Sequence, residues 1–394
     1  MTPTIVEVTA APLRRPEVLG RTAPPSASWD STGMMHALSS DRSFAGQAMR
    51  FEPPWDDALC VVTASDGSFG VGMTSQAGPV MPIINDFFGP MIVGESVLAI
   101  ERLWNMMSRS ANSAFGAAGL AAYALSAVDL ALWDLKGKVL GRPVYELMGG
   151  PARERTRCYA TGNDLDDSRN RGFDAFKLAG SVGPGSGTAG ITETERLVAS
   201  ARSELGPDAD IMLDCWSSLD ASYAVRLGEA LAPYRLTWIE DYAQPDDWPG
   251  YADVRRRLPT QMLAAGERWL TDRAFAYAAQ QRLVDVLQPD VQWVGGATAV
   301  LRIAAIAASS GIELALHGGS NDSYGQHLCH ALAQNRWAEM YVGCPPGESL
   351  MNAWRSTPGM SLPDDGWLVP SEAPGFGIEL TSEQIDAAVG QADS

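Results

Sequence analysis

Five ionisable side chains stand at the ends of successive short apolar runs in the second half of the sequence. The runs are Asp210–Asp214, Leu236–Glu240, Met262–Glu267, Asp285–Asp290 and Glu313–His317, so that four acids and one histidine come last. If these runs are parallel strands of a barrel, their final side chains meet at one mouth. The pattern therefore predicts a polar centre built from the ends of several strands.

Three of these acids, Asp214, Glu240 and Glu267, lie on consecutive runs. Their carboxylates would repel one another unless a cation lay between them, and the sequence shows no neutralising lysine beside them. Ligands that are all oxygen suit Mg²⁺, which keeps open positions for substrate oxygens. We therefore predict a Mg²⁺ site. The simpler alternative is that each acid is a solvated strand end or a helix cap.

The remaining pair, Asp290 and His317, suits acid–base chemistry. An imidazole has an unperturbed pKa of ~6.5, which is close to working pH. A carboxylate behind the ring fixes its tautomer and stabilises the imidazolium once a proton has been accepted. We predict a catalytic dyad here, although a strand-end histidine can also be structural. His327 and His330 follow on an expected helix and are interpreted as structural or peripheral.

Lys177 ends another apolar run, Phe173–Leu178, and should face the same mouth. Side chains two residues apart lie on the same side of a strand, so Ala179 is the next residue on that side. Lys177 would supply a cation near a substrate carboxylate or a leaving oxygen. The alternative is an ordinary surface lysine.

The elements that carry these residues alternate between short strands and helices. The five runs that end in Asp214, Glu240, Glu267, Asp290 and His317, together with Arg157–Thr161, Phe173–Leu178 and Trp337–Tyr341, make eight. Nearly continuous apolar strands with helices between them indicate parallel pairing with both faces covered. Eight such units are the number in a (β/α)8 barrel of the TIM type. The fold class is therefore predicted as α/β.

The first part of the chain has a different pattern. The first ~15 residues and Leu59–Val71 alternate like strands, with a hairpin turn at Asp66-Gly67. Residues 14–54, here called the lid, are rich in Ser, Pro, Gly and Met. A loop of that length is usually functional or disordered. Helices are expected at Val97–Arg109 and Gly119–Lys138. We divide the chain into a first domain (1–125), a barrel (126–356) and a C-terminal segment (357–394) that returns to the first domain.

Bulk properties narrow the function classes. The chain has 394 residues, which is more than the ~250–300 residues at which a single hydrophobic core usually stops growing. We therefore expect two domains. A net charge of −18 makes nucleic acid and anionic membranes poor partners. Five cysteines without a CxxC pair indicate reduced thiols, and the start lacks the apolar core of a signal peptide. We therefore expect a cytoplasmic protein. Its longest apolar helix contains Asp129, Asp134 and Lys136, so we interpret this helix as part of the core and not as a membrane span.

Several motifs together resemble a known family. They are Val128–Asp134 (VDLALWD), Met212–Trp216 (MLDCW), Trp238–Glu240 (WIE), Gln288–Val291 (QPDV) and His317–Ser320 (HGGS). These runs are similar to the mandelate racemase branch of the enolase superfamily, and within it to rhamnonate dehydratases. The resemblance covers nearly the whole chain. It implies an α+β capping domain over a modified (β/α)8 barrel, Mg²⁺ held by Asp214, Glu240 and Glu267, and a His317–Asp290 dyad.

The resemblance also points to residues around the substrate. Relatives often carry a second lysine where Ala179 stands, so that base is absent here. Glu339 would hydrogen-bond the carboxylate or enediolate, which requires its protonated form. An arginine in the lid can clamp a carboxylate, which implicates Arg42, although loop arginines are usually solvated. Two departures lie where substrate hydroxyls would bind: Arg268 replaces a histidine, and the lid histidine is matched by Trp29, with His36 close by.

The predicted function is a Mg²⁺-dependent sugar-acid dehydratase, because the absence of a second lysine leaves His317 as the base and favours elimination over racemisation. It would abstract the proton next to a carboxylate through a metal-stabilised enediolate and eliminate the β-hydroxyl, giving a 2-keto-3-deoxy acid. A small sugar acid as substrate and a homo-oligomeric assembly are expected. The alternatives are a racemase or epimerase of a 2-hydroxy acid and a non-catalytic binding protein. A dehydrogenase is a further rival, because residues 185–190 (GSGTAG) fit GxGxxG and Asp214 follows at a suitable distance.

Overall fold

The computed structural model describes residues 2–13, 35–44, 53–343, 347, 349–350, 359–381 and 383–385. Trp29, Cys344 and most of the lid lie outside these residues. The cysteines within the described part, Cys60, Cys158, Cys215 and Cys329, are buried and free. In the same part of the chain, none of the helices is both long and apolar enough to cross a membrane.

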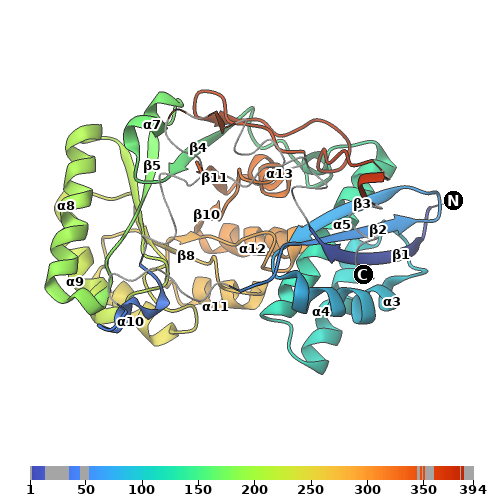
Figure 1. The fold of residues 1–394 in the computed structure, drawn as a ribbon, viewed down its shortest axis with the longest axis horizontal. Coiled ribbons are helices and arrows are strands. Elements are labelled where there is room, and N and C mark those ends of the chain that lie inside the picture. The colour runs from blue at the N-terminus through green and yellow to red at the C-terminus, as the bar shows by residue number, and fades with distance from the viewer. Residues whose placement is uncertain are drawn as a thin grey trace.

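An antiparallel sheet and a group of helices form one end of the molecule (Figure 1). The strands pair in the order β1 (Ile5–Pro12), β2 (Ala58–Ala64) and β3 (Phe69–Thr74). The hairpin predicted at Asp66-Gly67 is confirmed, since these residues join β2 to β3. The helical elements that follow are α2 (Ala77–Pro82), the π-helix η3 (Ile83–Phe88), α3 (Gly89–Ile92) and α4 (Ile100–Ala114).

Helix α5 (Leu120–Leu140) lies between this sheet and the barrel and is buried on almost every side. Its position explains why the helix is apolar all round and why its two acids are satisfied inside the core. Asp129 accepts hydrogen bonds from the backbone and hydroxyl of Thr298, on the barrel side. Asp134 accepts from the backbone N–H groups of Val71 and Phe376. The prediction of a core helix is confirmed.

The sheet approaches α5 through a strand that lacks side chains at the contact. A Cβ atom on Gly72 of β3 would stand 1.9 Å from the carbonyl oxygen of Ala127. We expect Gly72→Ala to lower the free energy of unfolding by about 3 kcal/mol, because the helix and the sheet must separate to make room. Urea unfolding measures this, with Val6→Ala on the exposed side of β1 as a control expected to change little. Equal stability of Gly72→Ala and the wild type would contradict the packing described here.

Eight parallel strands form a closed barrel, because the last, β11, pairs with the first, β4. The strands are β4 (Thr156–Thr161), β5 (Ala175–Ala179), β6 (Asp210–Asp214), β7 (Trp238–Glu240), β8 (Leu263–Ala265), β9 (Val286–Leu287), β10 (Glu313–Leu316) and β11 (Asn335–Tyr341). The principal helices around them are α7 (Leu165–Asn170), α8 (Gly187–Leu205), α9 (Ala221–Leu231), α10 (Trp248–Arg257), α11 (Asp272–Gln280), α12 (Gly296–Ser310) and α13 (Ser323–Ala331). The predicted fold, a TIM-type barrel with a second α+β unit, is confirmed.

The C-terminal segment runs along the barrel and reaches α5. Its strand β12 (Trp367–Leu368) pairs antiparallel with the beginning of β4. Further on, the ring of Phe376 packs against Tyr324 and His327 of α13. His327 and His330 are buried there, in agreement with the structural role predicted for them. The domain boundaries at residues 125 and 356 stay a prediction.

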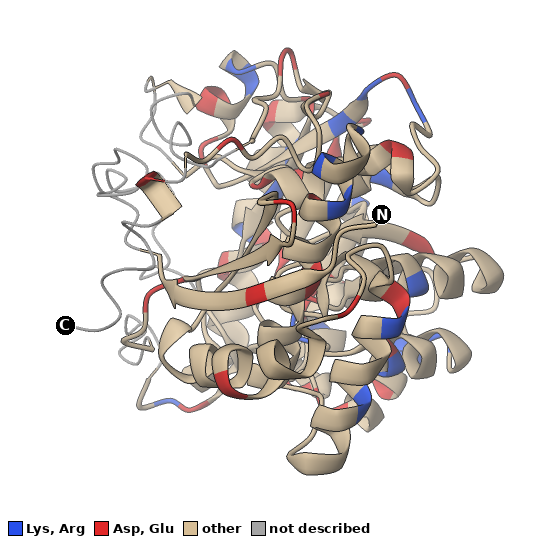
Figure 2. Ribbon diagram, turned by 90° about the vertical axis from the view of Figure 1, so that its right-hand side faces the viewer, with Lys and Arg blue, Asp and Glu red and all other residues tan. Residues whose placement is uncertain are grey.

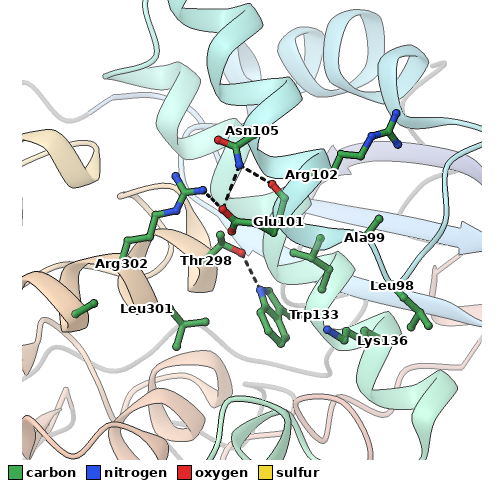
Figure 3. A pocket seen from close by; sticks show the side chains of 12 residues that line it. Leu98, Ala99, Glu101, Arg102, Asn105, Trp133, Lys136, Thr298, Leu301 and Arg302 are labelled. Carbon is green, nitrogen blue, oxygen red and sulfur yellow. Dashed lines mark hydrogen bonds and ion pairs between the residues drawn. The ribbon is translucent and has the colours of Figure 1, made fainter.

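A hollow of about 700 Å³ lies between α4, α5 and α12 (Figure 3). On its wall the indole N–H of Trp133 donates to the hydroxyl of Thr298, 3.0 Å away. Arg302 closes one side through an ion pair with Glu101. None of its lining residues lies at the end of a barrel strand, so this hollow is separate from the predicted polar centre. At the end of the molecule that carries the antiparallel sheet, acidic and basic positions are interspersed along the helices (Figure 2).

Candidate active site

The centre of the barrel is filled by one apolar side chain from each strand. These residues form a buried cluster: Tyr159, Ala175, Met212, Trp238, Ala264, Val286, Ala315 and Trp337. Because side chains alternate along a strand, the next inward residue lies two positions further towards the strand end. The sequence of each strand therefore decides what stands above the apolar layer.

On seven strands that next inward residue is polar. The seven are Thr161, Lys177, Asp214, Glu240, Gln288, His317 and Glu339. On β8 the residue two positions further along is Gly266. Its backbone φ of 142° lies in the region that glycine adopts more readily than other residues. A Cβ atom there would stand 2.7 Å from the Phe275 ring. The chain turns at this glycine, and the acid of the β8 strand end is the following residue, Glu267.

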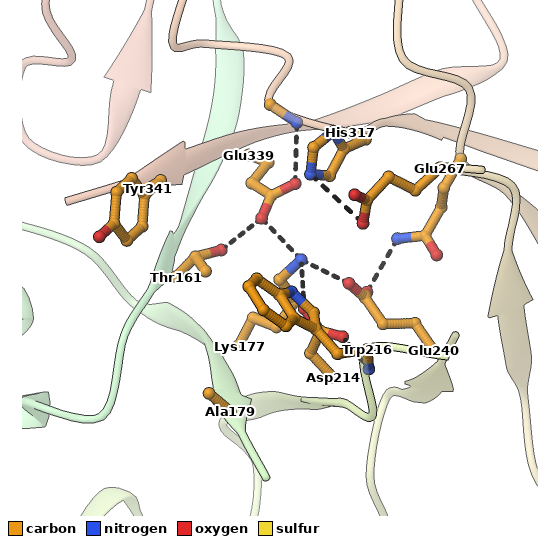
Figure 4. A network of polar contacts seen from close by, with 12 residues as sticks. Thr161, Lys177, Ala179, Asp214, Trp216, Glu240, Glu267, His317, Glu339 and Tyr341 are labelled. Carbon is orange, nitrogen blue, oxygen red and sulfur yellow. Dashed lines mark hydrogen bonds and ion pairs between the residues drawn. The ribbon is translucent and has the colours of Figure 1, made fainter. Parts of the chain in front are cut away.

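Lys177 lies among the acids of this layer (Figure 4). Its ammonium pairs with Glu240, approaches Glu339 at 2.6 Å and stands 3.6 Å from Asp214. The expectation that no lysine accompanies the acids is therefore wrong. The reason is the barrel geometry: β5 is the neighbour of β6, so that a lysine remote in sequence reaches across. Burial alone would lower the pKa of Lys177, but these carboxylates raise it well above its usual value.

Glu240 uses its two oxygens differently. Oε2 accepts hydrogen bonds from the indole of Trp238 at 2.6 Å and from the amide of Gln288 at 2.8 Å, and Oε1 faces Lys177. Sequence reasoning missed both donors. Trp238 and Gln288 each lie two residues before an acid of the site, so strand alternation was the signal that could have found them.

The acids fit a divalent cation by donor type and by charge. The pKa of Asp214 is raised well above its usual value, first by burial and then by repulsion from Glu240 and Glu267, against the opposing effect of Lys177. Glu267 pairs with Arg268 at 2.8 Å and approaches His317 at 3.5 Å. Among the described residues, no three His, Cys, Asp or Glu side chains already surround one metal-sized point. Joint binding of an ion would require the Lys177 ammonium to turn away from Asp214 and Glu240.

The predicted dyad is brought together. Nδ1 of His317 lies 2.8 Å from Oδ2 of Asp290, while Nε2 faces the acids. Burial alone would lower the pKa of His317, but the charge of Glu267 and the hydrogen bond with Asp290 outweigh it and raise the pKa to about 10. The imidazole also packs beside the indole of Trp293, with ring centroids 5.2 Å apart.

These side chains open into a hollow of about 480 Å³, here called the main hollow. Its lining includes five predicted residues: Lys177, Asp214, Asp290, His317 and Glu339. It also includes residues that sequence reasoning missed, namely Thr161, Trp216, Gln292, Trp293, Asn321 and Tyr341. A smaller hollow of about 260 Å³, the side hollow, shares Trp216 with it and is lined by His36, Glu267 and Arg268 among others.

The residues predicted to contact the substrate differ in their burial and in their neighbours. His36 is buried and caps the 3-10 helix η2 (Ala37–Ser40), with Nδ1 accepting from the backbone of Leu38. The guanidinium of Arg268 lies 4.5 Å from the centre of the Trp293 ring. Arg42 is exposed.

The glycine-rich segment 185–190 packs against the described part of the lid. A Cβ atom on Gly185 would stand 2.8 Å from the carbonyl oxygen of Ser39 and 2.9 Å from that of Asp41. The 3-10 helix η4 (Pro184–Ser186) and then α8 follow the loop after β5. The segment thus belongs to the second βα unit of a closed barrel, and the dinucleotide-binding interpretation is wrong for this fold.

A capped (β/α)8 barrel with a cluster of acids and a His–Asp pair at its strand ends is the class of protein that the fold and site define. A sequence profile described as "Enolase C-terminal domain-like" matches residues 161–385. A second, "Mandelate racemase / muconate lactonizing enzyme, N-terminal domain", matches residues 57–149. The chain belongs to the mandelate racemase branch of the enolase superfamily, as its motifs predicted.

Individual relatives agree with this assignment. The L-rhamnonate dehydratase of Saccharopolyspora erythraea is 36% identical over 82% of this chain and 82% of its own length. The crystal structure of a rhamnonate dehydratase from Gibberella zeae complexed with Mg has a TM-score of 0.88 and 26% identity, covering 98% of this chain and 96% of that one. An enolase from Bradyrhizobium complexed with magnesium and mandelic acid has a TM-score of 0.75 and 26% identity, covering 98% and 99%.

Proposed function

We propose that the protein is a Mg²⁺-dependent lyase that dehydrates a sugar acid to a 2-keto-3-deoxy acid. The observation that carries the proposal is the meeting of Lys177, Asp214 and the His317–Asp290 pair around one hollow, with Glu240 paired to Lys177 and Glu267 beside His317. The relatives named as rhamnonate dehydratases support it. A polyhydroxylated acid suits a hollow whose lining includes hydroxyl, amide and carboxylate groups.

Asp214, Glu240 and Glu267 would hold the metal. When bound there, Mg²⁺ supplies positive charge that polarises a substrate carboxylate and makes the neighbouring carbon more acidic. Lys177 adds a second cation beside the same carboxylate or the leaving oxygen. The role expected for Glu339 needs a protonated acid, yet Lys177 and His317 outweigh the effect of burial and lower its pKa to about 2. We therefore propose that Glu339 holds the Lys177 ammonium in place.

His317 is the proposed base. Its Nε2 faces the acid layer, and Asp290 holds Nδ1 in the tautomer that leaves Nε2 able to accept a proton. A base must be neutral before it accepts a proton, and the charge of Glu267 is the main attraction that keeps His317 protonated in this arrangement. That attraction would be weakened if the Glu267 carboxylate were holding the metal ion. The β-hydroxyl then leaves with a proton, which the imidazolium of His317 can return.

Racemisation is the second candidate, because this family also includes racemases by name. Inverting a carbon through proton transfer requires a base on each face. Among the described residues that line the main hollow, His317 is the one proposed base, since Ala179 stands on the Lys177 side and Arg268 is too basic to accept protons routinely. Proton NMR of the product separates the candidates: dehydration converts the acid to a keto acid with a new methylene group, whereas racemisation changes only its configuration.

Asp290→Asn tests the orienting role within this proposal. An amide cannot stabilise the imidazolium or fix its tautomer as a carboxylate does, so we expect kcat to fall about 10- to 100-fold with a small change in KM. Steady-state kinetics with an acid that the wild type dehydrates provides the measurement. Mg²⁺ affinity serves as the internal control and should stay near that of the wild type. An unchanged kcat would remove Asp290 from the mechanism.

Three further expectations accompany the proposal. Arg42, His36, Arg268 and Trp29 stay predicted substrate contacts, and Trp29 lies outside the described residues. A homo-oligomer also stays a prediction, which light scattering after gel filtration would test directly. A cytoplasmic location and the absence of nucleic-acid and membrane partners stay predictions from composition.

A further inference from the structure

Trp216 occupies a position that the proposed mechanism does not use. It is half-buried, it lines both the main hollow and the side hollow, and it packs with Tyr341 against Ala179. Trp216 and Lys177 both line the main hollow (Figure 4). Ala179 is fully buried against the rings of Trp216 and Tyr341. We call Trp216, Tyr341 and Ala179 the aromatic wall.

The backbone at Trp216 is held in an uncommon conformation. Its φ is +47°, and that of the next residue, Ser217, is +52°. A bulky residue rarely adopts the left-handed region, and such strain persists mainly at ligand clamps and active sites, where surrounding contacts enforce it. Here the N–H of Trp216 donates to Oδ1 of Asp214 at 2.9 Å, and Ser218 donates to the carbonyl oxygen of Cys215 at 2.8 Å. The loop thus fixes the indole relative to an acid of the centre.

The wall places apolar surface on the Lys177 side of the main hollow, while a second indole, Trp293, lies on the His317 side. Lys177, Asp214, Glu339 and His317 present charge, whereas the Trp216 indole presents apolar surface and packs against Ala179, whose side chain is fully buried. A hydroxy acid has the complementary division: its carboxylate and hydroxyl groups are polar, and the edge of its carbon chain is made of C–H groups. Aromatic rings bury such C–H surface favourably.

We propose that Trp216, supported by Tyr341 and Ala179, is a specificity-determining residue against which the carbon chain of the substrate lies. The carboxylate end would then be held by Lys177 and by the metal ion that the acids would bind, so this inference rests on the proposed function for the orientation of the substrate. It adds to that function the part of the ligand that the aromatic wall would contact, which is the apolar edge of a 2-hydroxy acid.

The test uses acids that bind without reacting. Glycolate, lactate, 2-hydroxybutyrate and 2-hydroxyvalerate lack a β-hydroxyl group and therefore cannot be dehydrated. Their affinities are measured by calorimetry with the full chain in Mg²⁺. For the wild type we expect affinity to rise with each carbon by up to about fourfold, the value for a fully buried methylene. In Trp216→Asn we expect this increase to disappear, while glycolate binding stays within about twofold of the wild type.

Asparagine is chosen because it tolerates the left-handed backbone. A merely structural tryptophan would predict a lower Tm for Trp216→Asn, whereas a strained ligand-binding residue predicts an equal or higher Tm. Trp133→Phe, in the separate hollow of Figure 3, is the matched control and should keep the wild-type dependence on chain length. Trp216→Phe should keep part of it.

Two results would overturn the inference. One is a wild-type affinity that does not change with chain length, and the other is the same dependence in Trp216→Asn as in the wild type. A lower Tm with equal losses for all four acids would likewise assign Trp216 a structural role and reject the wall. If chain-length dependence is found and no sugar acid is dehydrated, the proposed function fails and the wall stands.

Discussion

Glu240→Gln is expected to abolish Mg²⁺-dependent turnover and to weaken Mg²⁺ binding by well over the ~100-fold that changes to outer-shell partners cause. Glu240 lies in register between Asp214 and Ala264 on the neighbouring strands. Its Oε1 accepts from the Lys177 ammonium, and its Oε2 is already held by Trp238 and Gln288. An amide keeps an acceptor for those two donors but loses the negative charge that attracts a cation. Calorimetric titration of metal-free protein measures the affinity.

Glu313→Gln is the matched control for this experiment. Glu313 begins β10, at the opposite end of a barrel strand, and pairs with Arg336 near the surface. It should leave both Mg²⁺ binding and turnover unchanged, because exposed ion pairs contribute little. Retention of Mg²⁺-dependent activity in Glu240→Gln would refute the assignment of the metal-binding acids.

His317→Asn is expected to lose dehydration and also the exchange of the α-proton with solvent deuterium. A positioned general base contributes about 100- to 10,000-fold to the rate, and Nε2 of His317 is the imidazole nitrogen that faces the acid layer. Proton NMR in D₂O follows both processes in one sample. Mg²⁺ affinity should be retained, which distinguishes this variant from Glu240→Gln.

Exchange at the wild-type rate in His317→Asn would show that another group removes the proton. Lys177 would then become the first candidate, since its ammonium lies in the same hollow and within 2.6 Å of Glu339. Parallel loss of exchange and dehydration, with metal binding intact, is the result that a single base at His317 predicts.

The fold could be predicted because each strand is recognisable from its own short segment of sequence. Continuous apolar runs separated by helices indicate a parallel sheet, and β6 (Asp210–Asp214) has the predicted bounds. The runs predicted at Met262–Glu267 and Asp285–Asp290 are longer than the strands β8 and β9. Gly266 ends β8, and the acids beyond these strands lie in the following loops. Apolar character alone does not mark where hydrogen bonding between strands stops.

The candidate site could be predicted only in part. The acids and His317 were recognisable because each follows its own strand. The closeness of Lys177 to Asp214 and Glu240 depends on strand register around the barrel, which no single segment encodes. Trp216 was missed for a related reason. Its place between the two hollows follows from the left-handed turn after β6. That turn contains no glycine, so the sequence does not indicate it.

The most direct test of the proposed function is a library screen for 2-keto acids. Metal-stripped protein is incubated with a panel of aldonic and related sugar acids, with and without added Mg²⁺, and semicarbazide detects the keto acids formed. For a Mg²⁺-dependent dehydratase we expect a 2-keto-3-deoxy product from at least one acid, formed only when Mg²⁺ is present. No keto acid from any member in the presence of Mg²⁺, or equal formation without the metal, would contradict it.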